Sequence, residues 1–468
     1  MTSINIFFGY LGIGVIVLAL AIISVDLPFT QFLALLCGVG FASLILLHPF
    51  TGLFLAVLSI QLSGVYVRLI PSMADLAIEG ILTLTIIGVI LNAPTLPRNQ
   101  RWFTYSPVFI LALLFLLVSF LSAQFSNFPE TAEMGLKKII ALIVLFYLIL
   151  LLVRTKWRIK ALLFAIMLST LISASLGIAS HFTGQSVLEV NASTSEMRQA
   201  GGANLSPTTS ANMMLVGTVV GLLLAFRSAK WRLFGLLIAL SGSTGILYSF
   251  ARSASLLLFA SFGWLAVKFR KNRYFPAGIA VVAALGIGLF QLIPDYLWNR
   301  FGNIDPSTDY TVGRRLGYHV IGLDMIEKDP VLGVGPGAFA DEYLDYEYRW
   351  ELGRGQEARA PHNLYLEVAA ETGLTGLAFF LAMIVTALIG VNRVYRHSED
   401  VELKFIAELI NFSYVIFLIA AATLPALTYK YTWTLTALAA TVTVVERRAY
   451  ETTRKPTVDK ETASVSDT

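Results

Sequence analysis

A short polar stretch, Ala360–Gly376, carries the side chains best suited to chemistry in this sequence. His362 and Asn363 stand where a polar segment ends and a long apolar run begins. Glu367 and Glu371 follow at a spacing of four residues, which places both carboxylates on one face of a helix. A neutral imidazole can accept a proton from a hydroxyl, so the stretch suggests acid–base chemistry at a helix start.

Asn363 favours this interpretation of His362 because asparagine is a strong N-cap residue. We expect a helix to begin directly after it, so that His362 lies beside the positive end of the helix dipole. That field disfavours the imidazolium and keeps the ring neutral, as a general base requires. A purely structural histidine is the alternative. Glu367 and Glu371 either orient the histidine or a sugar hydroxyl, or only favour the first turns of the helix.

Three arginines complement this histidine. Arg252 interrupts the apolar sequence between two predicted spans. It is either a fixed cation in a polar cavity or a side chain that extends to the membrane interface. Arg314 and Arg315 open a predicted helix in the polar segment. Arginines on one face suit a pyrophosphate, which accepts bidentate, charge-assisted hydrogen bonds.

A glycine-rich turn follows that predicted helix, which begins at Val312 and ends at Asp329–Pro330. Its apolar positions form a helical stripe: Val320, Leu323 and Ile326. The turn itself, Gly333–Gly337, resembles a phosphate cradle, but no strand precedes it. We therefore interpret it as a loop that needs positive φ angles. Gly373 and Gly376 are expected to allow close helix packing.

The elements that position these residues are membrane helices. The chain has 468 residues, of which 56% are hydrophobic and 14% are charged, whereas soluble domains carry about 25% charged residues. Apolar runs of about 20 residues recur, and the strand-like alternation of a β-barrel is absent. The sequence predicts an all-α polytopic membrane protein with about 12–14 transmembrane helices. The candidate spans are 4–25, 29–47, 49–66, 74–92, 105–124, 136–153, 158–180, 207–226, 232–249, 251–269, 274–293, 364–391, 404–424 and 427–445.

Basic residues set the expected orientation, because lysine and arginine concentrate in cytoplasmic loops. Alternation through the spans places most basic loops and both termini on one side, the cytoplasm. Residues 1–293 are then transmembrane helices, about 11 in number. Residues 294–363 form one large periplasmic or extracytoplasmic loop, 364–445 form about three further spans, and 446–468 form a disordered cytoplasmic tail.

Several functional classes lack support. The net charge of +4 is explained by loop residues that orient the protein, so no nucleic-acid partner is predicted. No cluster has metal-ligand spacing, and no nucleotide-binding or serine-hydrolase motif occurs. We therefore predict neither a metal nor another cofactor.

The motifs together resemble the C-terminal signature of the O-antigen ligase/polymerase family. The resemblance covers Arg315-Leu316, the segment Pro330–Phe339, and the residues from His362 to Gly376. Ala251-Arg252-Ser253 is similar to a short arginine motif of the family, with alanine where serine is usual. His319 stands where the family often has tryptophan.

This resemblance implies a GT-C-like glycosyltransferase of the bacterial inner membrane, with its active site on the periplasmic face. Such enzymes move a glycan from an undecaprenyl diphosphate carrier to an acceptor hydroxyl on a glycolipid or glycan. Arg252 and Arg315, with Arg314 beside them, would hold the pyrophosphate of the donor. His362 would activate the acceptor hydroxyl, supported by Asn363, Glu367 and Glu371. Membrane lipids surround the protein.

Several activities remain open at this point. An O-antigen ligase acting on lipid A core is the favoured hypothesis, and a polysaccharide polymerase of the same family is its nearest alternative. A secondary transporter of an anion such as bicarbonate would favour broken helices at the bilayer midplane and paired repeats, which the sequence does not show. A peptidoglycan-type polymerase would use an extracytoplasmic carboxylate as base, so that Glu367 or Glu371 would outrank His362.

Overall fold

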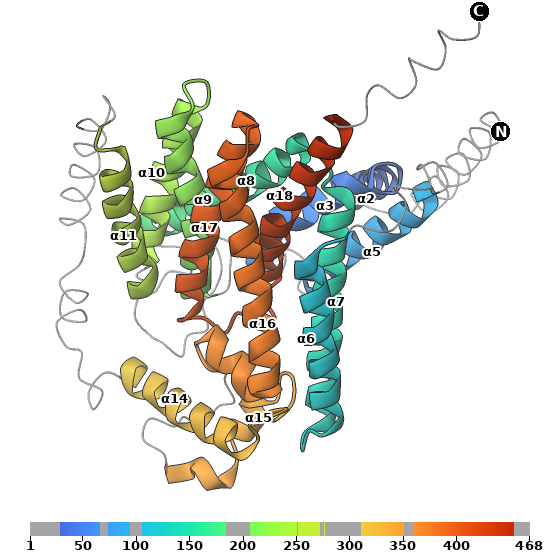
Figure 1. Ribbon diagram of the computed structural model, residues 1–468, viewed down its shortest axis with the longest axis vertical. Helices are drawn as coiled ribbons and strands as arrows, with labels where there is room; N and C mark the ends of the chain where they lie inside the picture. The colour runs from blue at the N-terminus through green and yellow to red at the C-terminus, as the bar shows by residue number, and fades with distance from the viewer. Residues whose placement is uncertain are drawn as a thin grey trace, which may run out of the picture.

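The structure is a computed structural model that describes residues 29–65, 74–93, 105–183, 206–249, 251–271, 276, 310–350 and 360–453. All regular structure in these residues is helical, which confirms the all-α prediction (Figure 1). In this part of the chain, six helices are long and apolar enough to cross a membrane. They are α6 (Pro107–Gln124), α7 (Pro129–Leu152), α8 (Lys156–Thr183), α9 (Pro207–Arg227), α16 (Leu364–His397) and α17 (Val401–Ala421).

Further helices fall on other predicted spans. They are α2 (Phe29–Leu47), α3 (Pro49–Ile60), α5 (Ala74–Asn92), α10 (Arg232–Tyr248), α11 (Arg252–Phe269) and α18 (Lys430–Thr453). The predicted spans 4–25 and 274–293 lie outside the described residues. The total of about 12–14 spans, the GT-C-like fold and the region boundaries therefore stay predictions.

Proline fixes where several of these helices begin. Pro49, Pro107, Pro129 and Pro207 each occupy the first turn of their helix. Proline is favoured there because its φ is already helical and its missing N–H would have had no partner in the helix. The spans predicted to begin at 49, 105 and 207 start at or within two residues of these prolines, whereas the one predicted at 136 begins earlier, at Pro129.

Helix α9 lies at the centre of the bundle, and its residues from 209 to 225 are all buried. It packs most extensively against α10, α17 and α8. Small residues permit this, since a Cβ on Gly221 would lie 2.9 Å from the carbonyl oxygen of Gly235 in α10. Backbones can approach this closely only where no side chain intervenes.

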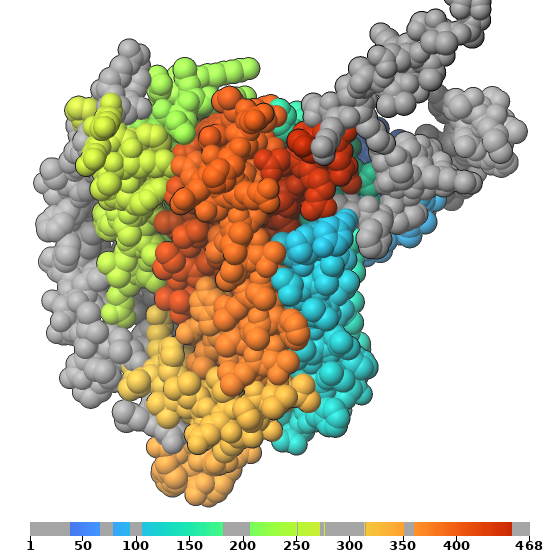
Figure 2. Space-filling model, viewed as in Figure 1, coloured from blue at the N-terminus to red at the C-terminus, as the bar shows by residue number. Residues whose placement is uncertain are grey.

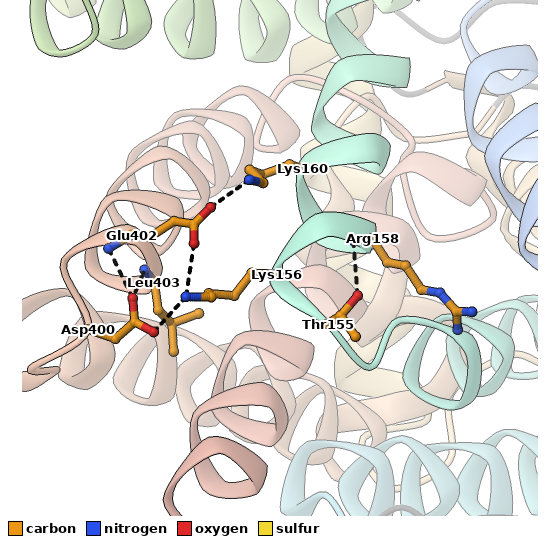
Figure 3. Close-up of polar contacts among 7 residues, drawn as sticks. All are labelled: Thr155, Lys156, Arg158, Lys160, Asp400, Glu402 and Leu403. Carbon is orange, nitrogen blue, oxygen red and sulfur yellow. Dashed lines mark hydrogen bonds and ion pairs between the residues drawn. The ribbon is translucent and has the colours of Figure 1, made fainter. Parts of the chain in front are cut away.

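Basic residues of separate loops gather at one end of the bundle. Lys156 Nζ lies 2.8 Å from Asp400 Oδ2 and 2.9 Å from Glu402 Oε2, which joins the start of α8 to the start of α17 (Figure 3). We call this the basic end, defined by Lys156, Lys160, Arg227 and Lys230. Loops predicted to share a compartment therefore do lie together. Which compartment this is stays a prediction.

The opposite end carries the segment 310–350, here called the cap (Figures 1 and 2). It contains α14 (Tyr310–Lys328), α15 (Phe339–Tyr343) and the 3₁₀ helix η5 (Tyr346–Trp350). The cap has a hydrophobic core of its own, built around Tyr318, Ile321, Met325, Phe339 and Tyr343.

The predicted stripe on α14 was wrong at Val320 and Leu323, whereas Ile326 is partly buried and packs against the core of the cap. Val320 and Leu323 are 45% and 62% exposed. Tyr318, Ile321 and Met325 are instead at most 2% exposed. The rings of Tyr318 and Tyr343 lie tilted with their centroids 5.3 Å apart, and α14 packs against both α15 and α16. The helix turns its aromatic face towards them.

Candidate active site

At the junction between the cap and the bundle, Asn363 is the N-cap residue of helix α16. The Asn363 side-chain oxygen accepts hydrogen bonds from the backbone N–H groups of Tyr365 (3.0 Å) and Leu366 (3.3 Å). Helix α16 begins at Leu364, as the sequence predicted. These bonds satisfy N–H groups that have no partner within the helix. Half-buried His362 is thereby held beside the positive end of α16.

Helix α14 brings three further side chains to this junction. The Tyr318 ring lies 5.9 Å from the His362 ring, measured between centroids. His319 Nδ1 is 2.6 Å from the carbonyl oxygen of Arg315, and His319 Nε2 is 3.4 Å from Asn363 Nδ2. A carbonyl only accepts hydrogen bonds, so Nδ1 donates and Nε2 is left to accept from the amide of Asn363. His319 thus joins the backbone of α14 at Arg315 to Asn363, the residue that follows His362.

The sequence did not single out Tyr318 or His319 as site residues. Two signals were present: His319 follows Arg315 by four residues, and Tyr318 follows it by three. Both spacings put a side chain on the same side of a helix as Arg315. His319 was noted only as a departure from the family pattern. The structure shows that it occupies the contact between α14 and Asn363.

The glycine-rich turn is fastened to a break in α16. Val334 N–H donates to Ala370 O at 2.9 Å, Gly335 N–H to Glu371 O at 3.0 Å, and Leu374 N–H to Pro330 O at 2.8 Å. Gly373 has a φ of 68° and interrupts the helix where the turn docks. The turn is therefore a structural clamp on α16. The sequence predicted its positive φ angles but not its docking against the helix.

Glycine is required on both sides of this clamp. Gly333, Gly335 and Gly337 all have positive φ, a region that residues with a Cβ rarely adopt. A Cβ on Gly333 would collide with the carbonyl oxygen of Ala370, and one on Gly373 with that of Val331. Gly373 does allow close packing, as expected. The packing is between the glycine-rich turn and the interruption in α16, not between two helices.

Glu367 and Glu371 are both buried, at 4% and 3% exposure, and both bind backbone. Glu371 Oε2 accepts from Gly337 N–H at 2.7 Å, which adds a side-chain bond to the clamp. Glu367 Oε2 accepts from Leu427 N–H at 3.1 Å, in the connection between α17 and α18. The described contacts give both carboxylates a positioning role. Their part in the reaction stays untested.

The predicted arginines are placed unequally. Arg315 is half-buried on α14, next to His319. Arg252 is the first residue of α11, and in the described part of the chain α11 packs mainly against α9 and α17. The side chain of Arg314 lies outside the described residues. The structure brings Tyr318 to His362 and His319 to Asn363, and the roles of Arg315 and Arg252 stay predictions.

An ion-pair cluster holds the cap in shape. Lys328 Nζ lies 2.8 Å from Asp324 Oδ2 and 2.6 Å from Glu347 Oε1, while the hydroxyl of Tyr348 donates to Asp324 Oδ2 at 2.7 Å. The hydrogen bonds from Lys328 and Tyr348 lower the pKa of Asp324 below its ordinary value. Among the described residues, no three His, Cys, Asp or Glu side chains form a group that could hold a metal ion.

Comparison with known proteins bears on this geometry. Residues 234–381 match the family model described as O-antigen ligase. The matched segment contains Arg252, the cap, the glycine clamp and the junction at His362. No curated protein matches the chain. The family match confirms the resemblance seen in the motifs, and it supports glycan transfer of the ligase or polymerase type.

Proposed function

From the match of residues 234–381 to the O-antigen ligase family, we propose that this multi-pass membrane protein transfers a glycan from an undecaprenyl diphosphate carrier to an acceptor hydroxyl. The observation that carries the proposal is the link between α14 and the start of α16. Tyr318 contacts His362, and His319 joins the backbone carbonyl of Arg315 to the side chain of Asn363. His319 of the cap, one helical turn after Arg315, is therefore held next to the helix start that carries His362.

These residues suit a displacement reaction at the anomeric carbon. The acceptor hydroxyl gives its proton to His362 as its oxygen bonds to that carbon, and the bond from the carbon to the diphosphate oxygen breaks. The lipid diphosphate leaves with its negative charge, which Arg315 and Arg252 stabilise. A diphosphate leaving group needs fixed positive charge more than it needs a protonating acid. The acceptor we propose is lipid A core.

The test is a transfer assay with purified protein in lipid nanodiscs. Its substrates are undecaprenyl-diphosphate-linked glycan, with and without lipid A core. Glycan attached to the core lipid is the expected product. Longer glycan chains formed from the donor alone would replace the ligase by a polymerase of the same family. If no transfer occurs and the protein moves bicarbonate across liposomes, glycan transfer itself is refuted.

A further inference from the structure

A cavity of about 730 Å³ lies at the basic end, at the opposite end of the bundle from the candidate active site (Figure 1). It is formed by α3, α8 and α17 together with the connection between α9 and α10. Its inner wall is apolar and buried: Leu163, Met167, Leu224, Ile406 and Leu409 are each at most 7% exposed. Pockets that hold a small ligand have volumes of about 300–1,000 Å³.

The outer residues of this cavity are aromatic and exposed. Trp157 is 64% exposed, Trp231 is 48% exposed and Phe164 is 38% exposed. Two of the enclosing helices, α8 and α17, are long and apolar enough to span a membrane, and both start beside the cavity. Tryptophan concentrates where membrane helices meet the lipid headgroups. The cavity therefore extends from the headgroup level towards the apolar interior of the bundle.

Positive charge lies at the same outer edge. Lys160 and Lys230 both line the cavity. Lys160 Nζ is paired with Glu402 Oε1, and Lys156 bridges Glu402 to Asp400 (Figure 3). Lys230 contacts the ring of Trp231 at 5.8 Å, and within the described residues no carboxylate pairs with it. One lysine thus remains available to an anion at the edge of the cavity.

An occupant must match both parts of this site. The apolar wall favours a hydrocarbon chain, and Lys230 beside Trp231 favours an anionic group at headgroup depth. Basic pockets between membrane helices bind anionic lipid headgroups for this reason. We infer that the cavity binds an anionic phospholipid of the surrounding membrane, with an acyl chain against Leu163, Met167 and Leu409 and its phosphate near Lys230. This inference does not depend on the transfer reaction.

The test compares lipids on purified protein in a detergent that leaves bound lipid in place. Phosphatidylglycerol and phosphatidylcholine are each titrated, and bound lipid is counted by native mass spectrometry. Wild-type protein is expected to retain phosphatidylglycerol more tightly than phosphatidylcholine. Lys230→Gln should weaken phosphatidylglycerol binding about fivefold and leave phosphatidylcholine unchanged. Lys271→Gln, an exposed basic residue that does not line the cavity, is the matched control.

A second pair of variants tests the apolar wall. Ala161→Trp fills the cavity and should abolish retention of both lipids. Leu237→Trp places the same ring at an exposed position of α10 outside the cavity and should change nothing. Thermal unfolding of each variant checks that it is folded. Equal retention of the two lipids by wild-type protein would overturn the headgroup assignment, and full retention by folded Ala161→Trp would overturn the site.

Discussion

His319 Nε2 lies 3.4 Å from Asn363 Nδ2, so a residue of the cap meets the residue that begins helix α16. Asn363 uses both ends of its side-chain amide: the oxygen caps α16, and the nitrogen faces His319. His362, directly before it, is thereby coupled to α14. Movement of the cap would therefore change the position of His362.

Replacing His319 by phenylalanine tests this coupling. His319→Phe keeps a ring at the position but removes the nitrogen that accepts from Asn363. Because Asn363 still caps α16, the thermal unfolding midpoint should stay unchanged, while the rate of glycan transfer falls about tenfold or more through loss of orientation at His362. Asn363→Ala should also lose the N-cap hydrogen bonds at the start of α16, which lowers the free energy of unfolding by about 0.5–2 kcal/mol.

The control for this pair is His397→Phe, at the exposed far end of α16. It should have wild-type stability and wild-type transfer. A fully active His319→Phe would show that the contact between His319 and Asn363 has no part in the reaction.

The glycine clamp should be intolerant of any side chain. Gly333→Ala and Gly373→Ala each force a Cβ into the facing backbone at a positive φ angle. Each should lower the free energy of unfolding by about 1–3 kcal/mol. Gly80→Ala is the control, because a Cβ there meets nothing within 4 Å. Chemical unfolding of the purified protein measures all three, and wild-type stability of both clamp variants would contradict the clamp.

The cap should lose stability in acid. The pKa of Asp324 is lowered in the folded protein, so its ion pair stabilises the cap above the ordinary pKa of aspartate, about 4. That contribution disappears as the pH falls through the lowered value. The Asp324 side chain is 41% exposed, which limits the effect to about 1 kcal/mol or less.

Asp324→Asn provides the measurement. Its thermal unfolding midpoint should lie below that of the wild type at pH 7, and the two midpoints should converge as the pH falls below about 4. If the difference between the two midpoints stayed constant with pH, the charge of Asp324 would not be the source of its stabilising effect.

Kinetics should show whether Arg315 and Arg252 each contribute to binding the donor. Arg315→Ala and Arg252→Ala each remove hydrogen bonds to the proposed diphosphate, so kcat/KM for the lipid-linked donor should fall about 10- to 100-fold. Lysine should restore little, because it lacks the bidentate fork. Arg349→Ala is the control, since that side chain is exposed and stacks on Tyr346. A normal kcat/KM in Arg252→Ala would remove Arg252 from the site.

Local signals in the sequence were enough to predict most of the described helices, though not every helix end, and the N-cap residue Asn363. Proline and asparagine mark helix starts through their own backbone chemistry, and apolar length marks the spans. The roles of Glu371 and Gly373 were not predictable in this way. They depend on Gly337 and Val331, distant in sequence, and no local pattern shows that a loop docks against a broken helix. The buried face of α14 was missed for the same reason, since its partners lie in α15 and α16.

The most direct test of the account is the transfer rate of His362→Ala. The variant is assayed in nanodiscs with undecaprenyl-diphosphate-linked glycan and lipid A core, beside His397→Ala as the matched control. Loss of a general base should lower the rate by about 100-fold or more, with the unfolding midpoint near that of the wild type. The control should transfer normally. A folded His362→Ala variant that transfers glycan at the wild-type rate would contradict the assignment of His362 as the catalytic base.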